Sequence, residues 1–339
     1  MPKSKVTIRD VAREAGVSIG TASRAINDAP GVQGRTRDLV LAAARALDYQ
    51  PNAAARALRS RSSRLIGCLF ADVENPLFAR LYNALQDRWA EEGFVTMLST
   101  TSGRLDREIR SLEIFVERGL DAIVIAPNHE RDPGLLHVLK NFPAPVFILD
   151  RDMAVPGDRL LFDHQGAMRA AVQYLAALGH RDILPVLSHG DSRPGQLRHA
   201  GFDMAMREAG LPVFGKIEPE TQNSLVFNEI VEVFSGGARP SALIVQGTQI
   251  LSSTLNALAS LGLRIPDDIS VMAIGDSDMT RGHVPPITTM ALDHLETVRR
   301  IADPVLTRIK GLDQDDDTGA LQAYSLIERA SCIKAGSGG

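Results

Sequence analysis

The chain has 339 residues, more than one hydrophobic core usually supports, so two or three domains are expected. Its 44% hydrophobic and 23% charged residues are typical of a globular protein, and no apolar run is long enough to cross a bilayer. The start of the chain lacks the apolar core of a secretory signal. Cys68 and Cys332 are therefore expected to be buried free thiols in a reducing cytoplasm, with a disulfide between them as the alternative, and no Cys/His spacing indicates a metal site.

The charge is distributed unevenly along the chain. Residues 1–64 contain 12 Lys and Arg against 5 Asp and Glu, whereas the remaining residues contain 25 against 36. A basic segment attached to an acidic body is typical of a nucleic-acid-binding domain joined to a domain with another task. A disordered basic tail would have low complexity, whereas this segment has helical periodicity.

Two short helices separated by a glycine are predicted first. Thr7 and Asp10 have the spacing of a capping box that opens the first helix, and Gly16 ends it. Ser18 is a natural N-cap for a second helix that runs to about Asn27. Two helices joined in this way form a helix-turn-helix motif, whose second helix enters the major groove of DNA.

The second helix carries few large apolar side chains, because its outer face must fit into a groove. A narrow seam of Ala22, Ala25 and Ile26 is expected to pack inward. Hydroxyl groups on the outer face are suited to phosphate oxygens, which position a protein on DNA without reading its sequence. The residues expected to face base edges are Ile19, Gly20 and Arg24, and the hydroxyl residues are Ser18, Thr21 and Ser23.

A third helix is expected around Val40 and Leu47, and it ends in "DYQPN" because Pro51 cannot continue a helix. The following stretch, "NAAARALRSRSSR", is in part an interdomain linker. Residues 53–58 nevertheless have helix propensity. A helix this short is unstable alone in water, so its stability is expected to come from DNA or from a second subunit.

From Leu65 onward, short apolar strands alternate with amphipathic helices. The first set of strands is "LIGCLF", "FVTMLS", "DAIVIAP", "PVFILD" and "RLLFDH", and the second is "DILPVLS", "GKIEP", "ALIVQG" and "SVMAIG". This alternation predicts parallel sheets covered by helices on both faces. Two sets indicate two lobes with a cleft between them, and ligands of such sheets bind beyond the carboxyl ends of the strands.

These segments resemble one known family. "VTIRDVAREAGVSIGTASRAIN", "TRDLVLAAARALDYQPN" and "AARAL" are similar to the DNA-binding head and hinge of the lactose-repressor (LacI/GalR) family of bacterial transcription regulators, and the likeness continues to about Glu328. The resemblance implies an α/β fold with an N-terminal all-α helix-turn-helix head, a hinge helix and a two-lobed periplasmic-binding-protein-like body of parallel sheets. In that body the chain crosses between the lobes three times. One departure is Gln33, where the family usually has serine, and Gly34 or Thr36 is the alternative cap of the third helix.

The resemblance also implies how the hinge meets DNA. In the family, the hinge helices of a dimer lie in the minor groove, where a leucine from each opens the central base step. That role falls on Leu58, and Ala55 permits close approach of the helices. The candidate DNA-contacting residues are Thr7, Ser18, Ile19, Gly20, Thr21, Ser23, Arg24, Asn27, Tyr49, Asn52, Ala55 and Leu58. The expected domains are the head at 1–50, the hinge helix and linker at 51–64, lobe 1 at 65–163 and 293–322, and lobe 2 at 164–292 and 323–335.

The residues that follow the predicted strands are the candidates for the effector site. In "LRHAGF" the family places an arginine in the cleft, here Arg198, whose guanidinium suits vicinal hydroxyls or a carboxylate. "DVENPLF" resembles the family's pocket loop, with Phe78 as a wall for the apolar face of a ring. Capping of the following helices is an equally good role for Asp72 and Asp150. The candidate effector-binding residues are Asp72, Asn75, Phe78, Asn128, Asp150, Arg198, Gln246 and Asp276.

The chain departs from hexose-binding members of the family. They often carry an Asn-Asp pair where Gly247 and Thr248 stand here, and an acid where Gly275 stands. The pocket therefore has fewer carboxylates than a typical hexose site, and a common pyranose is not expected.

The sequence predicts a cytoplasmic, dimeric, sequence-specific DNA-binding regulator that acts as a repressor. Its partners are pseudo-palindromic operator DNA and a small effector, a sugar or sugar derivative, bound between the lobes. An enzyme is not expected, because no G-x-S-x-G elbow or P-loop stands in a suitable place, and no cofactor, metal or membrane is implied. The alternative is a solute-binding protein of the periplasmic type without a regulatory role, which explains the body but not the basic head.

Overall fold

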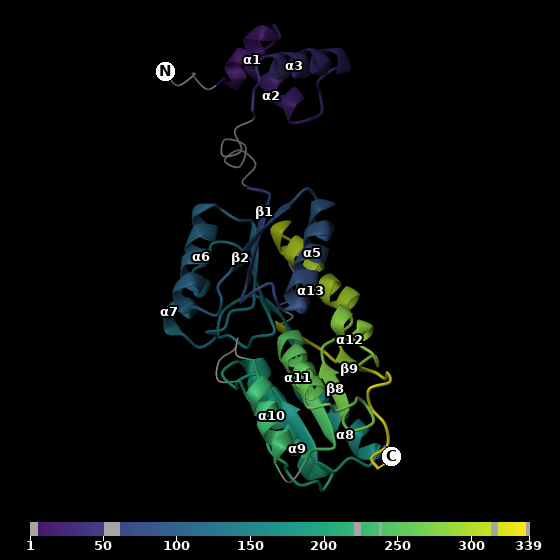
Figure 1. Cartoon of the computed structure of the whole chain (residues 1–339). Coiled ribbons are helices and arrows are strands. Elements are labelled where there is room, and N and C mark those ends of the chain that lie inside the picture. Colours follow the sequence, from purple (N-terminus) through teal and green to yellow (C-terminus); the bar gives the residue numbers. More distant parts are fainter. Residues whose placement is uncertain (1–5, 51–61, 220–224, 237–238, 313–317, 337–339) are drawn as a thin grey trace. The chain divides into compact units, whose positions relative to one another are not determined.

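In the computed structural model the chain forms two compact units, which we call the head (Met1–Ser63) and the body (Arg64–Gly339) (Figure 1). The predicted hinge residues Asn52, Ala55 and Leu58 lie outside the described residues. The structure describes residues 6–50, 62–219, 225–236, 239–312 and 318–336.

The first helix of the head begins where the sequence predicts. In α1 (Ile8–Glu14), the Asp10 carboxylate accepts hydrogen bonds from the backbone N–H and the hydroxyl of Thr7, at 2.9 and 2.7 Å. The helix ends at Gly16, whose φ of +63° lies in the left-handed region that glycine adopts without strain. Local side-chain and backbone chemistry therefore fixes both ends of α1.

The next two helices complete the head. Ser18 caps α2 (Ile19–Ile26) by accepting a hydrogen bond from the Thr21 N–H at 3.1 Å, as predicted. The third helix, α3 (Gly34–Ala46), ends before Pro51. Among the described residues of the head, the buried side chains are small, which allows the three short helices to approach closely. The buried core residues are Val11, Ala12, Ala22, Ala25, Val40 and Ala43.

The predicted cap of α3 is wrong. Gln33 itself occupies the N-cap position, with extended backbone (φ −64°, ψ 144°) and no hydrogen bond from its side chain. Gly34 and Thr36 lie inside the first turn, so neither caps the helix. A different contact secures this end, because the Arg37 guanidinium donates to the Ala29 carbonyl at 3.1 Å.

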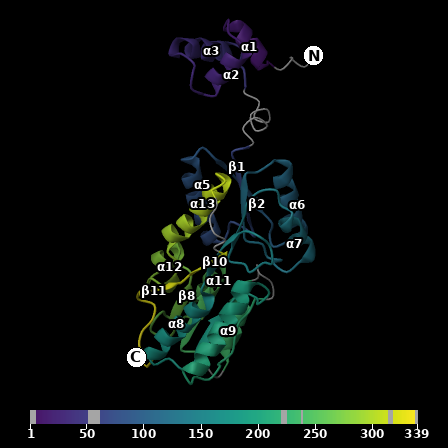
Figure 2. The ribbon, with the colours of Figure 1, turned by 180° about the vertical axis from the view of Figure 1, so that it is seen from behind.

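The first lobe of the body is a parallel six-stranded sheet in the order β10-β5-β4-β3-β1-β2. Helices α5 and α13 cover one face and α6 and α7 cover the other, because each helix buries its apolar side in a separate core cluster (Figures 1 and 2). The strands are β1 (Leu65–Phe70), β2 (Val95–Thr100), β3 (Ala122–Ile125), β4 (Val146–Leu149), β5 (Asp158–Phe162) and β10 (Thr318–Gln322). The helices are α5 (Pro76–Ala90), α6 (Leu105–Glu117), α7 (Pro133–Lys140) and α13 (His294–Ile309).

The second lobe is a five-stranded sheet in the order β11-β9-β8-β7-β6, with α8 and α9 on one face and α10 and α11 on the other. The sheet is parallel except for β11, which runs antiparallel to β9. The strands are β6 (Ile183–Val186), β7 (Ala242–Gln246), β8 (Ser270–Ile274), β9 (Thr288–Ala291) and β11 (Ser325–Ile327). The helices are α8 (His164–Ala177), α9 (Arg193–Glu208), α10 (Phe227–Ser235), α11 (Thr248–Ser260) and the short α12 (Asp278–Gly282).

The strand predicted at "GKIEP" does not form. Ile217 makes only an isolated bridge to Val186, with its N–H bonded to the Pro185 carbonyl at 3.0 Å. The left-handed Gly215, at φ 149°, and Pro219 flank this bridge, so regular pairing cannot extend along the segment.

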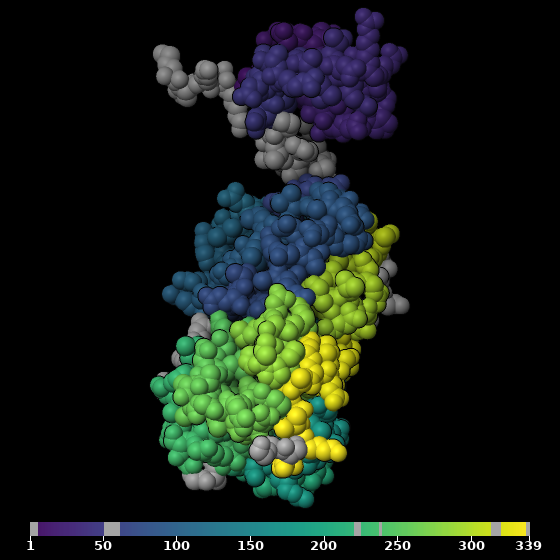
Figure 3. Space-filling model, turned by 45° about the vertical axis from the view of Figure 1, so that its right-hand side comes forward, coloured from purple at the N-terminus to yellow at the C-terminus, as the bar shows by residue number. Residues whose placement is uncertain are grey.

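Three chain segments connect the two lobes: β5 to α8, β9 to α13, and β10 to β11. The space-filling view shows the C-terminal segment (yellow) lying along the second lobe (Figure 3). Cys68 is buried and Cys332 is half-buried, and both are free thiols, so the expectation of complete burial is wrong for Cys332. In the described part of the chain, no helix combines the length and apolar character needed to span a membrane.

Candidate functional site

The first candidate site is the outer surface of α2 in the head. Ile19 is 48% exposed, and Gly20 and Arg24 are exposed beside it. Arg24 makes no hydrogen bond or ion pair among the described residues, so its guanidinium donors are available. Ala22 and Ala25 are buried on the opposite side. The helix therefore separates a packing face from a free face, as the sequence predicts.

Several hydroxyl and amide groups on α2 have partners within the helix. Ser18 Oγ lies 2.9 Å from Thr21 Oγ1, and the Asn27 amide donates to the Ser23 carbonyl at 2.7 Å. These exposed groups retain further hydrogen-bonding capacity toward a phosphate. Of the remaining predicted contacts, Thr7 is exposed, whereas Tyr49 is half-buried and packs against the head's core.

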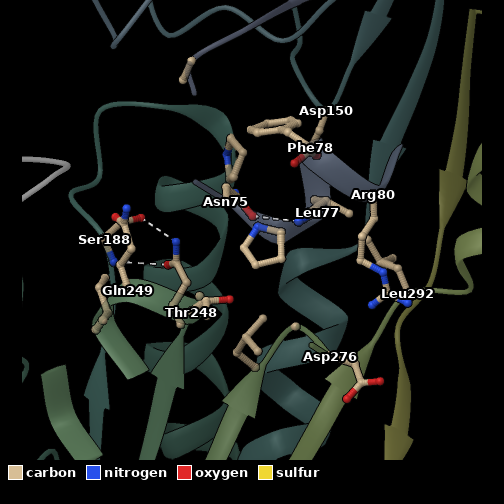
Figure 4. A pocket seen from close by; sticks show the side chains of 18 of the residues that line it. Asn75, Leu77, Phe78, Arg80, Asp150, Ser188, Thr248, Gln249, Asp276 and Leu292 are labelled. Atoms are coloured by element: carbon tan, nitrogen blue, oxygen red, sulfur yellow. Dashed lines mark hydrogen bonds between the residues drawn. The ribbon is translucent and has the colours of Figure 1, made fainter. Parts of the chain in front are cut away.

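The second candidate site is a cavity of about 350 Å³ between the lobes, which we call the interlobe pocket (Figure 4). Lobe 1 contributes the start of α5, the turns after β3 and β4, and the start of α13. Lobe 2 contributes α9 and the turns after β6, β7 and β8. The structure brings all the sequence-predicted effector residues into this wall: Asp72, Asn75, Phe78, Asn128, Asp150, Arg198, Gln246 and Asp276.

Asp150 lies at the centre of a buried polar network. It follows β4 in a left-handed conformation (φ 53°), and its Oδ1 accepts from the Phe162 N–H at 3.2 Å. His164 Nε2 lies 2.8 Å from Asp150 Oδ2, and the Tyr324 hydroxyl lies 3.2 Å from His164 Nδ1. Because burial lowers the pKa of His164 to about 4, its ring is neutral at pH 7. His164 thus donates to Asp150 and accepts from Tyr324.

The carboxylate of Asp150 is held ionised. Burial by itself raises its pKa, but His164 and the guanidinium charges of Arg151 and Arg198 outweigh that effect, so the pKa lies below its ordinary value. Arg193 Nη1, from α9 in the other lobe, donates to Asp150 Oδ1 at 3.0 Å. This pair joins the two lobes at the edge of the pocket.

Other polar contacts also cross between the lobes. The Arg193 N–H donates to Glu130 at 2.7 Å, and the Gln249 amide donates to Glu74 at 2.6 Å. A ligand that changes the angle between the lobes must change these bonds.

Two further predicted residues are bonded within lobe 2. Both ends of the Gln246 amide meet Ser188: Nε2 donates to Ser188 Oγ at 2.7 Å and Oε1 accepts from its N–H at 3.1 Å. Asp276 accepts from Thr280 and from Arg329, each at 2.8 Å. Burial raises the pKa of Asp276, but these bonds outweigh it and lower the pKa below its ordinary value.

The lobe 1 residues form an apolar wall and a capped helix start. Phe78 stacks on Phe70 with ring centroids 4.8 Å apart, and it lines the pocket. Asn75 Oδ1 caps α5 by accepting from the Leu77 N–H at 3.0 Å, while Asp72 accepts from the Asn75 N–H at 2.8 Å. For Asp72 the observed contact is therefore with its own turn.

Sequence reasoning missed several residues of the pocket wall. Arg80 lies on α5 three residues after Leu77, so helical periodicity was a usable signal for it. Tyr324 and His294 lie beside two of the crossings between lobes, and no local pattern marks where these crossings place their side chains. In the described ranges, no group of His, Cys, Asp and Glu side chains is placed to hold a metal ion.

Two family models match this chain, one in the head and one in the body. Residues 7–52 match "Bacterial regulatory proteins, lacI family", and residues 172–332 match "Periplasmic binding protein-like domain". The HTH-type transcriptional repressor PurR of Serratia proteamaculans (strain 568) is 30% identical over 334 residues, 96% of each chain. The HTH-type transcriptional regulator DegA of Bacillus subtilis (strain 168) is 27% identical over 292 residues, 85% of this chain and 86% of DegA.

A solved structure of the Lac repressor dimer, bound to operator and the anti-inducer ONPF, has the same fold. It superposes with a TM-score of 0.85 and 25% identity, covering 97% of this chain and 100% of that chain. The helical head, the two-lobed body and the 30% identity to PurR over nearly the full length lead to one conclusion: the chain belongs to the LacI family of bacterial transcriptional regulators.

Proposed function

We propose that the chain binds operator DNA as a homodimer through its heads, and that a small effector in the interlobe pocket controls this binding. The observation that carries the proposal is that both lobes line the pocket, so its occupant contacts both at once. A ligand that binds one arrangement of the lobes better shifts the chain toward that arrangement. Repression is the expected outcome, because the PurR relatives are named repressors.

On DNA, α2 is the recognition helix. Its free guanidinium at Arg24 is suited to the paired acceptors of guanine in the major groove, and Thr21 is suited to a phosphate. A dimer has two such heads, so its operator is pseudo-palindromic. The Lac repressor, which was solved as a dimer on its operator, supports this arrangement. The wedge role of Leu58 stays a prediction.

The relatives also help to choose between a regulator and the alternative functions. A solute-binding protein without a regulatory role is not supported, because relatives that match nearly the whole chain are transcriptional regulators. Membership in this family supports the expected cytoplasmic location and a function without a catalytic step.

The experiment has two stages. Selection of bound sequences from random duplexes gives the operator, and its affinity is then measured with sugars, sugar acids and polyols present. Arg198→Ala should abolish the response to the effector in a chain whose head still binds the operator, because the head and the pocket lie in separate compact units. A variant that responds at the same effector concentration as the wild type would show that the effector binds elsewhere.

A further inference from the structure

Two of the three aspartates in the wall of the interlobe pocket are already paired with arginines of the protein. Asp72, Asp150 and Asp276 line the pocket. Asp150 pairs with Arg193 at 3.0 Å, and Asp276 pairs with Arg329 at 2.8 Å. Neither of these two arginines lines the pocket, so they compensate the carboxylates from outside its wall. A ligand hydroxyl therefore competes with a guanidinium for either acid.

The side-chain amide of Gln246, which lines the pocket, is engaged as well. Gln246 is bonded to Ser188 at both of its polar atoms, at 2.7 and 3.1 Å. Its carbonyl oxygen is a potential acceptor for a sugar hydroxyl, but it already accepts from the Ser188 N–H. The acceptors that normally hold a neutral sugar are thus largely committed to protein donors.

Among the described residues, two arginines of the wall form no direct ion pair with a carboxylate, although the charge of Arg198 does act on Asp150. Arg80, on α5 of lobe 1, is exposed and makes no hydrogen bond or ion pair among the described residues. Arg198, on α9 of lobe 2, has no ion pair among them, and its Nε is buried without a hydrogen-bond partner. Arg151 and Arg281 also line the pocket, but they lie near Glu130 and Asp276, respectively. Figure 4 shows Arg80 extending from α5 along the side of the pocket that holds Asp276.

The charges of these two arginines also affect neighbouring histidines. Burial is the main reason for the lowered pKa of His164, and the charge of Arg198 lowers it further. The pKa of His294 is likewise lowered by burial and then by the charge of Arg80. Cationic charge from each lobe therefore acts within the pocket. Like charges on two lobes oppose their closure, and an anion between them removes that opposition.

Resting on the proposed function, we propose that the effector is an anionic sugar derivative whose acid group is attracted by Arg80 and Arg198. The hydroxyl-bearing ring or chain lies against Phe78, and the acid group supplies the acceptors that two guanidinium groups require. Carboxylate and phosphate groups both offer negatively charged acceptor oxygens. The neutral sugar of the same skeleton has no such oxygens.

Matched pairs of compounds test the proposal on the full-length chain. The melting temperature is measured with D-gluconate against D-sorbitol, D-glucuronate against D-glucose, D-galacturonate against D-galactose, and glucose 6-phosphate against glucose. At least one acid should raise the melting temperature, because a ligand of the folded state stabilises it, while its neutral partner at equal concentration should not. The first three pairs test a carboxylate and the last tests a phosphate. A neutral partner with an equal effect, or no acid with a larger effect than its partner, overturns the proposal.

Two variants of Arg80 test whether its positive charge binds the acid group of the effector. Arg80→Ala should weaken binding of the active acid roughly 10- to 100-fold, the range expected for loss of a charged hydrogen bond, and Arg80→Lys should restore part of it. The matched control is Arg118→Ala. Arg118 is another exposed arginine of lobe 1, and its side chain has no partner among the described residues. It lies at the end of α6, outside the pocket wall. This control variant should leave the affinity unchanged. Equal affinities for the Arg80→Ala and Arg118→Ala variants would contradict the role of Arg80.

Failure of this inference is distinct from failure of the proposed function. A neutral sugar that binds and changes operator affinity, with the response lost in Arg198→Ala, overturns the anionic effector and leaves the regulator intact. A chain whose operator affinity responds to no ligand of the pocket overturns the proposed function itself.

Discussion

The head and the body make their candidate sites in different ways. In the head, Ile19, Gly20 and Arg24 lie on one short helix, and the buried side chains of the described head residues are all Val or Ala. In the body, the pocket draws on segments more than 200 residues apart in the chain, and large side chains such as Trp89 and Phe162 fill the core. A surface that reads a groove needs exposed side chains on a rigid helix, whereas a pocket needs enclosure from several sides.

The largest effect is expected from separating the two units. A chain that lacks residues 1–60 should lose specific DNA binding entirely, because the recognition helix is removed. It should keep ligand binding and nearly the same melting temperature, because the body has its own cores. Gel-shift and melting measurements check both. An insoluble body, or one that still binds the operator, would show that head and body do not carry separate functions.

A pH-dependent loss of stability is expected in the body. The pKa of His164 is about 4 in the folded chain against 6.5 for the ordinary side chain, so the unfolded chain binds the proton more readily. Its contribution to stability is full above pH 6.5 and is lost as the pH falls toward 4. The difference is on the order of 3 kcal/mol. Among the described residues of the head, no titratable side chain is buried, so the head should lack this effect.

Urea denaturation of the truncated body at pH 7, 5.5 and 4.5 measures the loss. A His164→Asn variant is the control, because its amide is able to donate to Asp150 but does not titrate in this range. The variant should lose less stability than the parent between pH 7 and 4.5. An identical loss would assign the pH dependence to other groups, such as His180, whose pKa burial also lowers.

A smaller effect is expected from Arg24→Ala. It should reduce operator affinity by ~1–3 kcal/mol and relax the preference at one base pair in each half-site, because a bidentate contact to guanine is lost. Competition between the operator and half-site-scrambled duplexes measures both quantities. Unchanged discrimination at every position would show that Arg24 does not read a base.

The smallest effect is expected from Thr21→Ala. A phosphate contact carries no base information, so affinity for operator and scrambled DNA should fall by the same modest factor. The fall should be measured against a Thr36→Ala control on α3. Loss of preference for one base pair would assign Thr21 to a base edge instead.

Much of the head was predictable from the sequence, because its determinants are local. Thr7 meets Asp10 and Ser18 meets Thr21 across a single helical turn, so their spacing in the chain already places them in contact. The cap of α3 was the exception, since its start is held by Arg37 bonding to the Ala29 carbonyl across a loop. In the body, the sequence also determined most strands and the polar residues at their ends, because apolar runs and strand ends are read along the chain.

Which of those polar residues remain available to a ligand depends on the packing of the two lobes. Gln246 meets Ser188 across 58 positions and Asp150 meets Arg193 across 43, so no spacing rule relates them. Arg80 has no such partner among the described residues. The charge that a pocket presents depends on which side chains neutralise one another across neighbouring strands and lobes. A sequence lists those charges, but only the fold determines which of them are paired.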